Sequence, residues 1–414
     1  MWKRITHLNP LSFFYYIPSQ VRDAFKKDLG ASILAGIFLA FINPFISVIA
    51  RRQLHANPFQ LSFISAASGI GQLLTFYWGC FAKTRNNKLK MVILPGIISR
   101  SIFLLMLLVY SINTFLIIIL MYQIISCIST PAYAEVIKLI YPDLLRGRLM
   151  GVVKMITNLV VIVATPIAGQ LVSNLGFRWT FFTGALFGIL SSLTFSRIKL
   201  KETAKEPEHA LYIKRALTIP FRDKSFGTYL AIFFMYGLGN WLSNPIYPIV
   251  LVDKLHVTNF QVGLLFTLTS ISASLSYIFW GRYIDKKGAI HGLFVTFFIA
   301  LGVPSGYLLA TVSSAFLFVC ISATISGIVN AGIDLGVMGA ILQLAPSEEI
   351  PNYMALHSTF VGIRGIAGPF LGAFLYRLIN ASGVFSINII FILLGGFLMY
   401  RFWSKTIKSG MENA

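Results

Sequence analysis

Charged residues are scarce in this sequence: Asp, Glu, Lys and Arg make up 12% of its 414 residues, whereas soluble globular proteins carry about 25%. Disordered chains need charge and low hydrophobicity to stay unfolded, and soluble enzymes need a charged surface, so the composition argues against both classes. Apolar residues instead make up 56% and aromatic residues 14% of the chain, and the mean hydropathy is +0.76. This composition predicts a protein that crosses a membrane many times.

Cysteine is scarce too, and its three positions, Cys80, Cys127 and Cys320, lie far apart. They exclude a disulfide framework and offer no metal-ligand spacing. The chain also lacks a phosphate-binding loop ending in Gly-Lys, a His-Glu-x-x-His and a Gly-x-Ser-x-Gly motif, each of which would indicate an enzyme or an ATPase. We therefore expect no enzymatic activity, no metal and no cofactor, and no ATP-driven transport unless a partner supplies the ATPase.

Long apolar runs are what the sequence has in abundance. A run of roughly 20 apolar residues is long enough to cross a bilayer as a helix. Twelve such runs cover residues 29–50, 60–82, 91–110, 113–134, 151–173, 178–196, 228–250, 260–281, 289–310, 314–341, 355–377 and 383–403. Residues 19–27, with Ser19 as N-cap, predict a separate short helix on the membrane surface. The predicted fold class is an all-α membrane protein with twelve transmembrane helices.

The net charge of +20, from 34 basic and 14 acidic residues, reflects the positions of the loops between these runs. Most basic residues fall at the two termini and in alternate loops. The exceptions are Arg51, Arg52, Arg178, Lys254 and Arg377 in the opposite loops, and Arg100 and Arg364 inside runs. Because basic loops stay in the cytoplasm, we expect both termini there and the chain in the cell membrane. The charge is thus a topology signal, which argues against a nucleic-acid partner.

The two halves of the sequence repeat each other. Matching pairs recur at a nearly constant offset: Asn43-Pro44 with Asn244-Pro245, His55 with His256, and Trp78-Gly79 with Trp280-Gly281. Both histidines directly precede helix-start signals, so we interpret them as loop residues. The repeat predicts an N-terminal segment (1–28), a first six-helix bundle (29–196), a charged cytoplasmic linker (197–227), a second six-helix bundle (228–403) and a cytoplasmic tail (404–414).

Several motifs resemble those of the major facilitator superfamily. Residues 281–288, Gly-Arg-Tyr-Ile-Asp-Lys-Lys-Gly, are similar to its signature Gly-x-x-x-Asp-Arg/Lys-x-Gly, and residues 142–151 are similar to its loop between spans 4 and 5. Residues 166–169 and 368–372 resemble the Gly-Pro-x-x-Gly element of its antiporters. One position departs from the pattern, because Lys83 stands where the first half should have the signature Asp. The resemblance covers the whole chain and implies two pseudo-symmetric bundles.

The resemblance also implies a central cavity lined by spans 1, 4, 7 and 10, with substrate bound between the halves. Pro44 and Pro245 lie inside spans 1 and 7 and should break these helices there. The residues expected to line the cavity are Asn43, Asn240, Trp241, Asn244, Tyr247 and Asn330. The alternative is that the amides only bond carbonyls freed by the kinks.

The Gly-Pro elements pair small residues with a kink in spans 5 and 11. They consist of Pro166 and Gly169 in the first half, and of Gly368, Pro369 and Gly372 in the second. Small residues let helix backbones approach closely. We expect both elements to pack against partners across the interface between the halves, and the resemblance associates them with antiport.

Charged loop residues predict a cytoplasmic gate. By pseudo-symmetry, Asp285 should meet the N-terminus of span 5 and the pair Arg146 and Arg148. In the other half of the gate the signs are exchanged: Lys83 and Arg85 should face Glu348 and Glu349. The alternative is that all of these are solvated loop charges of little energetic weight.

Charged residues inside spans are costly and mark function by default. Asp334 in span 10 and Arg364 in span 11 lie at similar predicted depths, so we expect them to form an ion pair that couples proton movement to substrate. The alternative is a permanent structural brace. Arg100 and Glu135 are a second candidate pair, which we interpret as structural.

These features together predict a secondary transporter that moves a small organic solute by alternating access, with proton-coupled export as the favoured mode. Its expected partners are the solute, protons and the lipid bilayer, and it should act as a monomer. The alternatives on the same fold are a lipid flippase and a solute importer. A non-transporting membrane receptor is the alternative of another class.

Overall fold

A computed structural model describes residues 19–84, 87–198 and 213–412, and within these ranges the chain is helical throughout and contains no strand. Helices satisfy every backbone polar group within one segment, which the apolar composition demands. The first half consists of α2 (Ser19–Ile42), α3 (Ile46–Arg52), α4 (Pro58–Thr84), α5 (Lys88–Ile102) with the 3-10 turn η3 (Phe103–Leu108), α6 (Ile112–Ile140), α7 (Asp143–Leu175) and α8 (Phe177–Ser196).

The second half begins with the short α9 (Ile213–Arg222), which lies in the expected linker. It continues with α10 (Lys224–Ser243), α11 (Tyr247–Ile249), the π-helical turn η4 (Val250–Lys254), α12 (Asn259–Lys287), α13 (Ala289–Ala300), α14 (Gly302–Ser313), α15 (Phe316–Leu344) and α16 (Ile350–Glu412). Asn380, with φ 59° and ψ −178°, breaks α16 into the last two spans.

Each of the twelve predicted runs is helical. By length and hydropathy alone, nine segments of the described chain qualify as membrane spans. One of these, α16, contains two predicted runs on either side of Asn380. The remaining two runs are α4 and α10, each of which packs along α16.

The separate surface helix expected at residues 19–27 does not exist. Instead α2 runs without interruption from Ser19 to Ile42, because a lone Gly30 does not stop a helix and the side chain of Asp28 is tied to α6. Asp28 is 1% exposed and accepts hydrogen bonds from Tyr141 Oη at 2.6 Å and Tyr133 Oη at 3.3 Å. The first span is therefore longer than the apolar run that predicted it.

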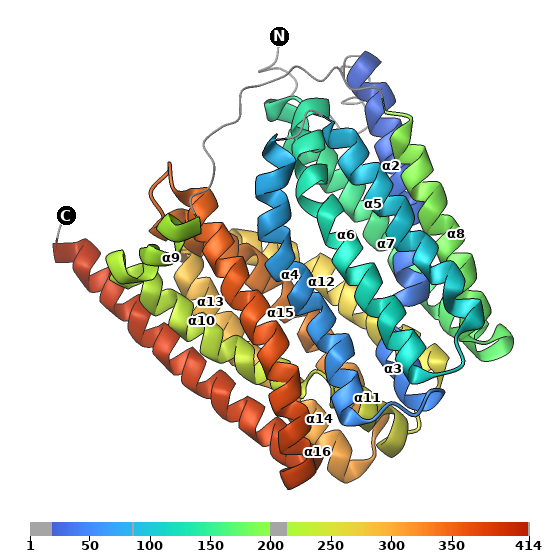
Figure 1. The fold of residues 1–414 in the computed structure, drawn as a ribbon. Coiled ribbons are helices and arrows are strands. Elements are labelled where there is room, and N and C mark those ends of the chain that lie inside the picture. Colours follow the sequence, from blue (N-terminus) through green and yellow to red (C-terminus); the bar gives the residue numbers. More distant parts are fainter. Residues whose placement is uncertain (1–18, 85–86, 199–212, 413–414) are drawn as a thin grey trace.

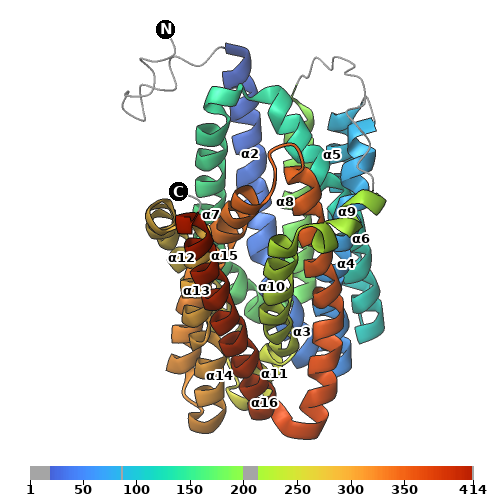
Figure 2. The same cartoon turned by 90° about the vertical axis from the view of Figure 1, so that its left-hand side faces the viewer.

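The two halves form separate bundles that meet at the end away from the termini and diverge toward the termini (Figure 1). Contacts between the bundles are made by α4 with α16, by α7 with α12, and by α3 with α11 and η4. In Figure 2, α10, α13, α14 and α16 of the second bundle lie in front of the first. The helices on both sides of the interface come from matching positions of the repeat.

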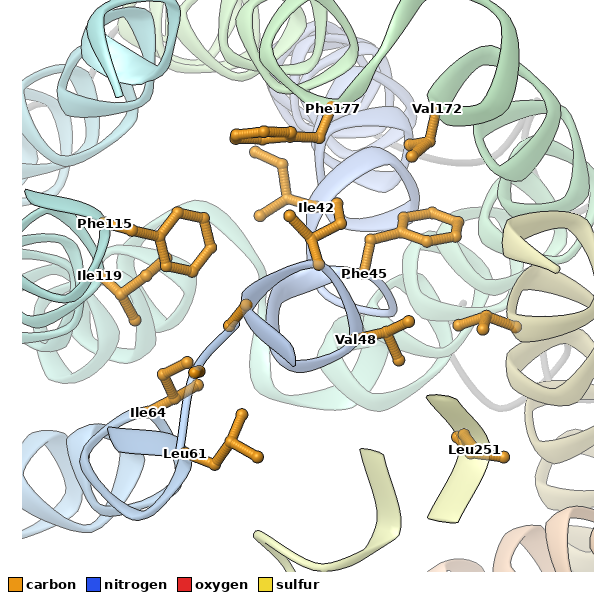
Figure 3. Close-up of a cluster of buried hydrophobic side chains, with 14 of the residues drawn as sticks. Ile42, Phe45, Val48, Leu61, Ile64, Phe115, Ile119, Val172, Phe177 and Leu251 are labelled. Carbon is orange, nitrogen blue, oxygen red and sulfur yellow. The ribbon is translucent and has the colours of Figure 1, made fainter. Parts of the chain in front are cut away.

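An apolar cluster fills the end where the bundles meet. It joins Phe45 and Val48 of the first half to Ile249 and Leu251 of the second, each at most 7% exposed. Figure 3 shows the labelled Leu251 in the same cluster as Phe45 and Val48. Burying this surface away from water and lipid headgroups holds the halves together at this end.

Candidate substrate cavity

A cavity of about 620 Å³ opens inside the second bundle, and most of the residues predicted to bind substrate line it. The expectation placed it between the halves, but its lining residues all come from the second half and none from spans 1 and 4. Helices α10, α11, α13, α14, α15 and α16 contribute its walls. The predicted residues on these walls are Asn240, Trp241, Asn244, Tyr247, Asn330, Asp334 and Arg364. Polar groups converging on a hollow of this size are typical of small-molecule sites, which measure roughly 300–1,000 Å³.

The two predicted helix breaks bring part of this wall into place. The backbone leaves the helix at residues 43–45 and again at residues 244–246, around Pro44 and Pro245. Tyr247, which follows the second break, borders both the main cavity and a neighbouring pocket of about 210 Å³ that Pro44 lines. Pro44 thereby brings the first half to the edge of the site.

Asn43 is the exception among the predicted cavity residues. It lies exposed at the first break and lines neither of the two pockets. Asn240 Nδ2 donates to the Tyr236 carbonyl of the preceding turn at 3.4 Å, which lies within the unbroken helix α10 and is not freed by the kink. Asn244 and Asn330 are exposed to the cavity.

Asp334 and Arg364 line the same cavity but do not form the expected ion pair in this conformation. The Asp334 carboxylate accepts a hydrogen bond of 2.5 Å from Tyr277 Oη on α12. The Arg364 guanidinium donates instead to the Phe233 carbonyl on α10 and lies over the Phe233 ring at 4.5 Å. The reason is Gly237 on α10, whose missing side chain leaves the space that the guanidinium occupies.

Tyr277 is a site residue that the sequence did not reveal. It belongs to a Ser- and Thr-rich stretch of α12 whose hydroxyls mostly bond backbone carbonyls, as Thr269 and Ser274 do. A tyrosine hydroxyl in a span needs a polar partner, and that requirement is the signal that could have singled it out. Only the packing of α12 on α15 identifies Asp334 as the partner.

The contact of Asp285 with Arg146 and Arg148, expected in the cytoplasmic gate, is not formed in this conformation. Asp285 is exposed near the end of α12 and, within the described part of the chain, has no ion-pair partner. Arg146 donates to the carbonyls of Lys138 and Tyr141 in its own half, and Arg148 is exposed. These charges lie at the end where the bundles diverge, so their meeting requires another conformation.

The structure describes only the acidic side of the second half of the predicted gate. Glu349 pairs with Arg222 of its own bundle at 2.6 Å, which raises the pKa of the Arg222 guanidinium above its ordinary value. Glu348 is exposed. Arg85 lies outside the described residues, and the side chain of Lys83 is outside them too.

Polar contacts at the opposite end join the halves and were not predicted. Arg51 makes a bidentate ion pair with Asp253, with Nε 3.1 Å from Oδ1 and Nη2 2.5 Å from Oδ2. Arg52 donates to the Asn259 side chain and to the Val257 carbonyl. Among these contacts the bidentate geometry is the strongest kind of ion pair. It closes the end of the molecule that the apolar cluster already fills.

A second cavity, of about 350 Å³, lies within the first bundle between α2, α5, α6 and α8. Asp28 and Arg100 both line it. Arg100 does not pair with Glu135 as expected: it donates to the Gly188 carbonyl at 2.9 Å and to the Ser192 hydroxyl. Glu135 bonds Lys138 at 2.8 Å and Lys88 at 3.5 Å.

Among the described residues no group of acidic, histidine and cysteine side chains could hold a metal ion.

Two helical bundles that meet at one end, with a polar cavity inside the membrane-spanning region, define a membrane transporter of the two-bundle class. A sequence model of the Major Facilitator Superfamily matches residues 29–236 and 229–411. The chain therefore belongs to the Major Facilitator Superfamily. It is a multi-pass membrane protein, and its family consists of transporters and not of enzymes, as the absence of catalytic motifs predicted.

Known proteins resemble the chain to different degrees. An uncharacterised MFS-type transporter of Methanocaldococcus jannaschii is 24% identical over 294 residues, which are 69% of this chain and 74% of that protein. The solved nucleoside transporter NupG has a TM-score of 0.72 at 12% identity, over 92% of this chain and 99% of its own.

Two further solved structures share the fold. A bacterial homologue of the human lysosomal transporter Spinster, solved in an inward-facing and unoccupied conformation, has a TM-score of 0.67 at 13% identity, over 95% of this chain and 98% of its own. The human organic anion transporter MFSD10 has a TM-score of 0.64 at 15% identity, over 92% and 100%. At these identities the likeness establishes the fold alone.

Proposed function

We propose that this chain is a proton-coupled secondary transporter that exports a small organic solute by alternating access. The observation that carries the proposal is Asp334, a carboxylate inside a transmembrane helix that faces the 620 Å³ cavity and bonds a tyrosine hydroxyl. Ionisable residues at membrane depth are expensive and mark ion pathways. A carboxylate without a cationic partner is free to bind and release a proton during the cycle.

The surroundings of Asp334 support a proton site. Tyr277 faces it from α12, Arg364 shares the cavity from α16, and Asn330 lies one turn away on α15. In this structure the hydroxyl of Tyr277 donates to Asp334 Oδ2. Once protonated, the carboxyl becomes a hydrogen-bond donor itself, so that the same contact must rearrange. Proton binding therefore changes the polarity of the wall that a solute contacts.

The distribution of contacts supports alternating access. The halves are joined at the end away from the termini, and the basic loops favour a cytoplasmic location of the termini. In this proposal the structure is the inward-facing state, with Arg51 and Asp253 closing the outer end. Asp285, Arg146 and Arg148 would meet in the outward-facing state, and Lys83 and Arg85 would face Glu348 and Glu349. Because all residues of the site come from one chain, a monomer suffices.

Export in exchange for protons is the favoured direction because the Gly-Pro elements resemble those of antiporters. A flippase or an importer on the same fold is the alternative. The polar wall formed by Asn244, Asn330, Asp334 and Arg364 favours a solute over a lipid tail. A receptor without transport activity would not need a titratable group in this cavity.

The test is proton-linked transport in everted vesicles with an acidic interior. Since the similar folds include nucleoside and organic anion transporters, uridine and benzoate are suitable first probes. We expect wild-type vesicles to accumulate a probe as the pH gradient dissipates. Asp334→Asn should lose accumulation but retain exchange of labelled for unlabelled probe, which needs no net proton movement.

The matched control is Asp23→Asn, which alters a carboxylate with 62% side-chain exposure near the start of α2. This variant should accumulate the probe like the wild type. Undiminished gradient-driven accumulation in Asp334→Asn would show that Asp334 is not the proton site.

A further inference from the structure

We propose that the transported solute is a small organic anion whose acidic group binds Arg364. This inference rests on the proposed function and names the substrate class of the same cavity. The geometry points to it because the guanidinium is buried in the cavity wall, carries a permanent charge, and lacks a counter-charge in the described protein.

The environment of Arg364 is apolar and aromatic. The residue is 6% exposed, and its guanidinium lies over the ring of Phe233. Its one described hydrogen bond goes from Nη1 to the Phe233 carbonyl, and its buried Nε has no partner. An arginine offers five N–H donors in a planar fork that fits a carboxylate. Only some of the N–H donors of Arg364 therefore have a hydrogen-bond partner in the described protein.

None of the ionisable groups around Arg364 neutralises it. On α10 these are Tyr229 and Tyr236, on α15 Asp334, and on α16 His357. Asp334 bonds Tyr277 instead, and His357 stacks against Tyr229. Removing a charge from water without pairing it costs several kcal/mol. An anion that enters the cavity would supply the missing charge.

The Arg364 guanidinium occupies space that is available only because residue 237 is a glycine. A methyl group added to Gly237 on α10 would overlap the guanidinium atoms of Arg364. Any larger residue at position 237 would push the arginine away from this place. The close approach of α10 and α16 thus holds the Arg364 guanidinium in the wall of the cavity.

The rest of the cavity indicates what the anion carries besides its acidic group. Trp241 and Tyr236 supply flat apolar surface, and Asn244 and Asn330 supply amides. The volume of about 620 Å³ suits a molecule of drug size. We therefore expect a carboxylate with an aromatic or aliphatic body, whereas an amine of the same shape would be repelled by Arg364.

The test is binding to the purified protein in detergent, where no proton gradient exists, measured by isothermal titration calorimetry. The probes are three matched sets: phenylacetate, phenylacetamide and phenethylamine; octanoate, octanamide and octylamine; indoleacetate, indoleacetamide and tryptamine. We expect at least one carboxylate to bind more tightly than its amide and its amine. If no carboxylate does so, the proposal is overturned.

Variants then locate the charge that recognises the anion. Arg364→Gln should weaken carboxylate binding by roughly 30-fold or more, as expected for removing one partner of a buried charged hydrogen bond, and Arg364→Lys should weaken it less. The control is Arg377→Gln, an exposed arginine on the same helix, which should bind like the wild type. A carboxylate preference that survives Arg364→Gln would overturn the proposal.

Gly237→Ala tests the same site without removing the charge. It should weaken carboxylate binding by displacing the guanidinium, whereas Gly281→Ala, where an added methyl group meets nothing within 4 Å, should not. If Gly237→Ala and the wild type bound carboxylates with equal affinity, Gly237 would not be needed to position the Arg364 guanidinium. Carboxylate preference combined with gradient-independent transport would overturn the proposed function alone.

Discussion

At the scale of single residues, the polar groups inside the membrane region are the informative ones. Asp28 and Arg364 are both nearly inaccessible, at 1% and 6% exposure. Their partners differ, however: Asp28 accepts from two tyrosine hydroxyls, whereas part of the Arg364 fork is without a partner. A buried group with its hydrogen bonds made stabilises the fold, and one with bonds missing is available to a ligand.

Tyr141→Phe should therefore destabilise the protein. It removes the hydrogen bond of 2.6 Å to Asp28 and leaves that carboxylate with Tyr133 alone, so the free energy of unfolding should fall by about 1–3 kcal/mol. The measurement is unfolding in a detergent titration. Tyr110→Phe removes a hydroxyl from a residue that is 75% exposed and should change nothing. Equal free energies of unfolding of the two variants would show that the hydrogen bond between Tyr141 and Asp28 does not stabilise the fold.

At the scale of helices, the two Gly-Pro elements have different packing roles. Gly169 on α7 lies against α12 of the other half, where an added methyl group would be 2.6 Å from the Asn259 carbonyl oxygen. Gly372 on α16 lies against the Leu242 backbone of α10, in its own half. The second element still meets the other half, because the Ser62 hydroxyl of α4 donates to the Pro369 carbonyl at 2.8 Å. The expectation of packing across the interface was therefore wrong for Gly372 and not for the element as a whole. The reason is that α16 faces α4 with one side and α10 with another.

Replacing Gly169 or Gly372 by a larger residue should consequently have different effects. Gly169→Leu should separate α7 from α12 and abolish transport, while the protein remains inserted and monodisperse. Gly372→Leu should instead disrupt the second bundle and lower its unfolding temperature. Transport assays and thermal unfolding of both single variants are the measurements. Gly151→Leu on α7, where nothing lies within 4 Å, is the control, and normal transport by Gly169→Leu would contradict the close approach.

At the scale of the whole molecule, one end is closed by an apolar cluster together with the bidentate pair of Arg51 and Asp253, whereas at the other end Asp285 is exposed. The two bundles can rock only if the closed end opens as the gate forms. The predicted gate of Asp285 with Arg146 and Arg148 remains a prediction for that other state.

Breaking the pair of Arg51 and Asp253 should shift the conformational equilibrium toward the state open at this end. Arg51→Asp alone places two carboxylates side by side, and we expect cysteine probes at this end to become more reactive. The exchange Arg51→Asp with Asp253→Arg restores opposite charges and should restore the wild-type reactivity. The reading of this pair as a latch is wrong if the single variant and the exchange variant react alike.

The sequence by itself determined the helices and their grouping. The scarcity of charge and the lengths of the apolar runs predict twelve spans, and the matching Asn43-Pro44 and Asn244-Pro245 pairs indicate two bundles with breaks in equivalent helices. These are local properties, because a helix in a membrane satisfies its hydrogen bonds within its own segment. The expectation that Asn244 and Asn330 line the cavity came instead from the resemblance to the superfamily, which implies that spans 7 and 10 face it.

Only the tertiary structure decided which polar groups meet. Arg364 and Asp334 are at similar depths along neighbouring spans, yet one bonds the Phe233 carbonyl and the other bonds Tyr277. The outcome depends on a missing side chain at Gly237 and on the packing of α12 against α15, neither of which a one-dimensional pattern contains. Side-chain partners across helices are set by rotation and distance between elements, and so they emerge only when the bundles are packed.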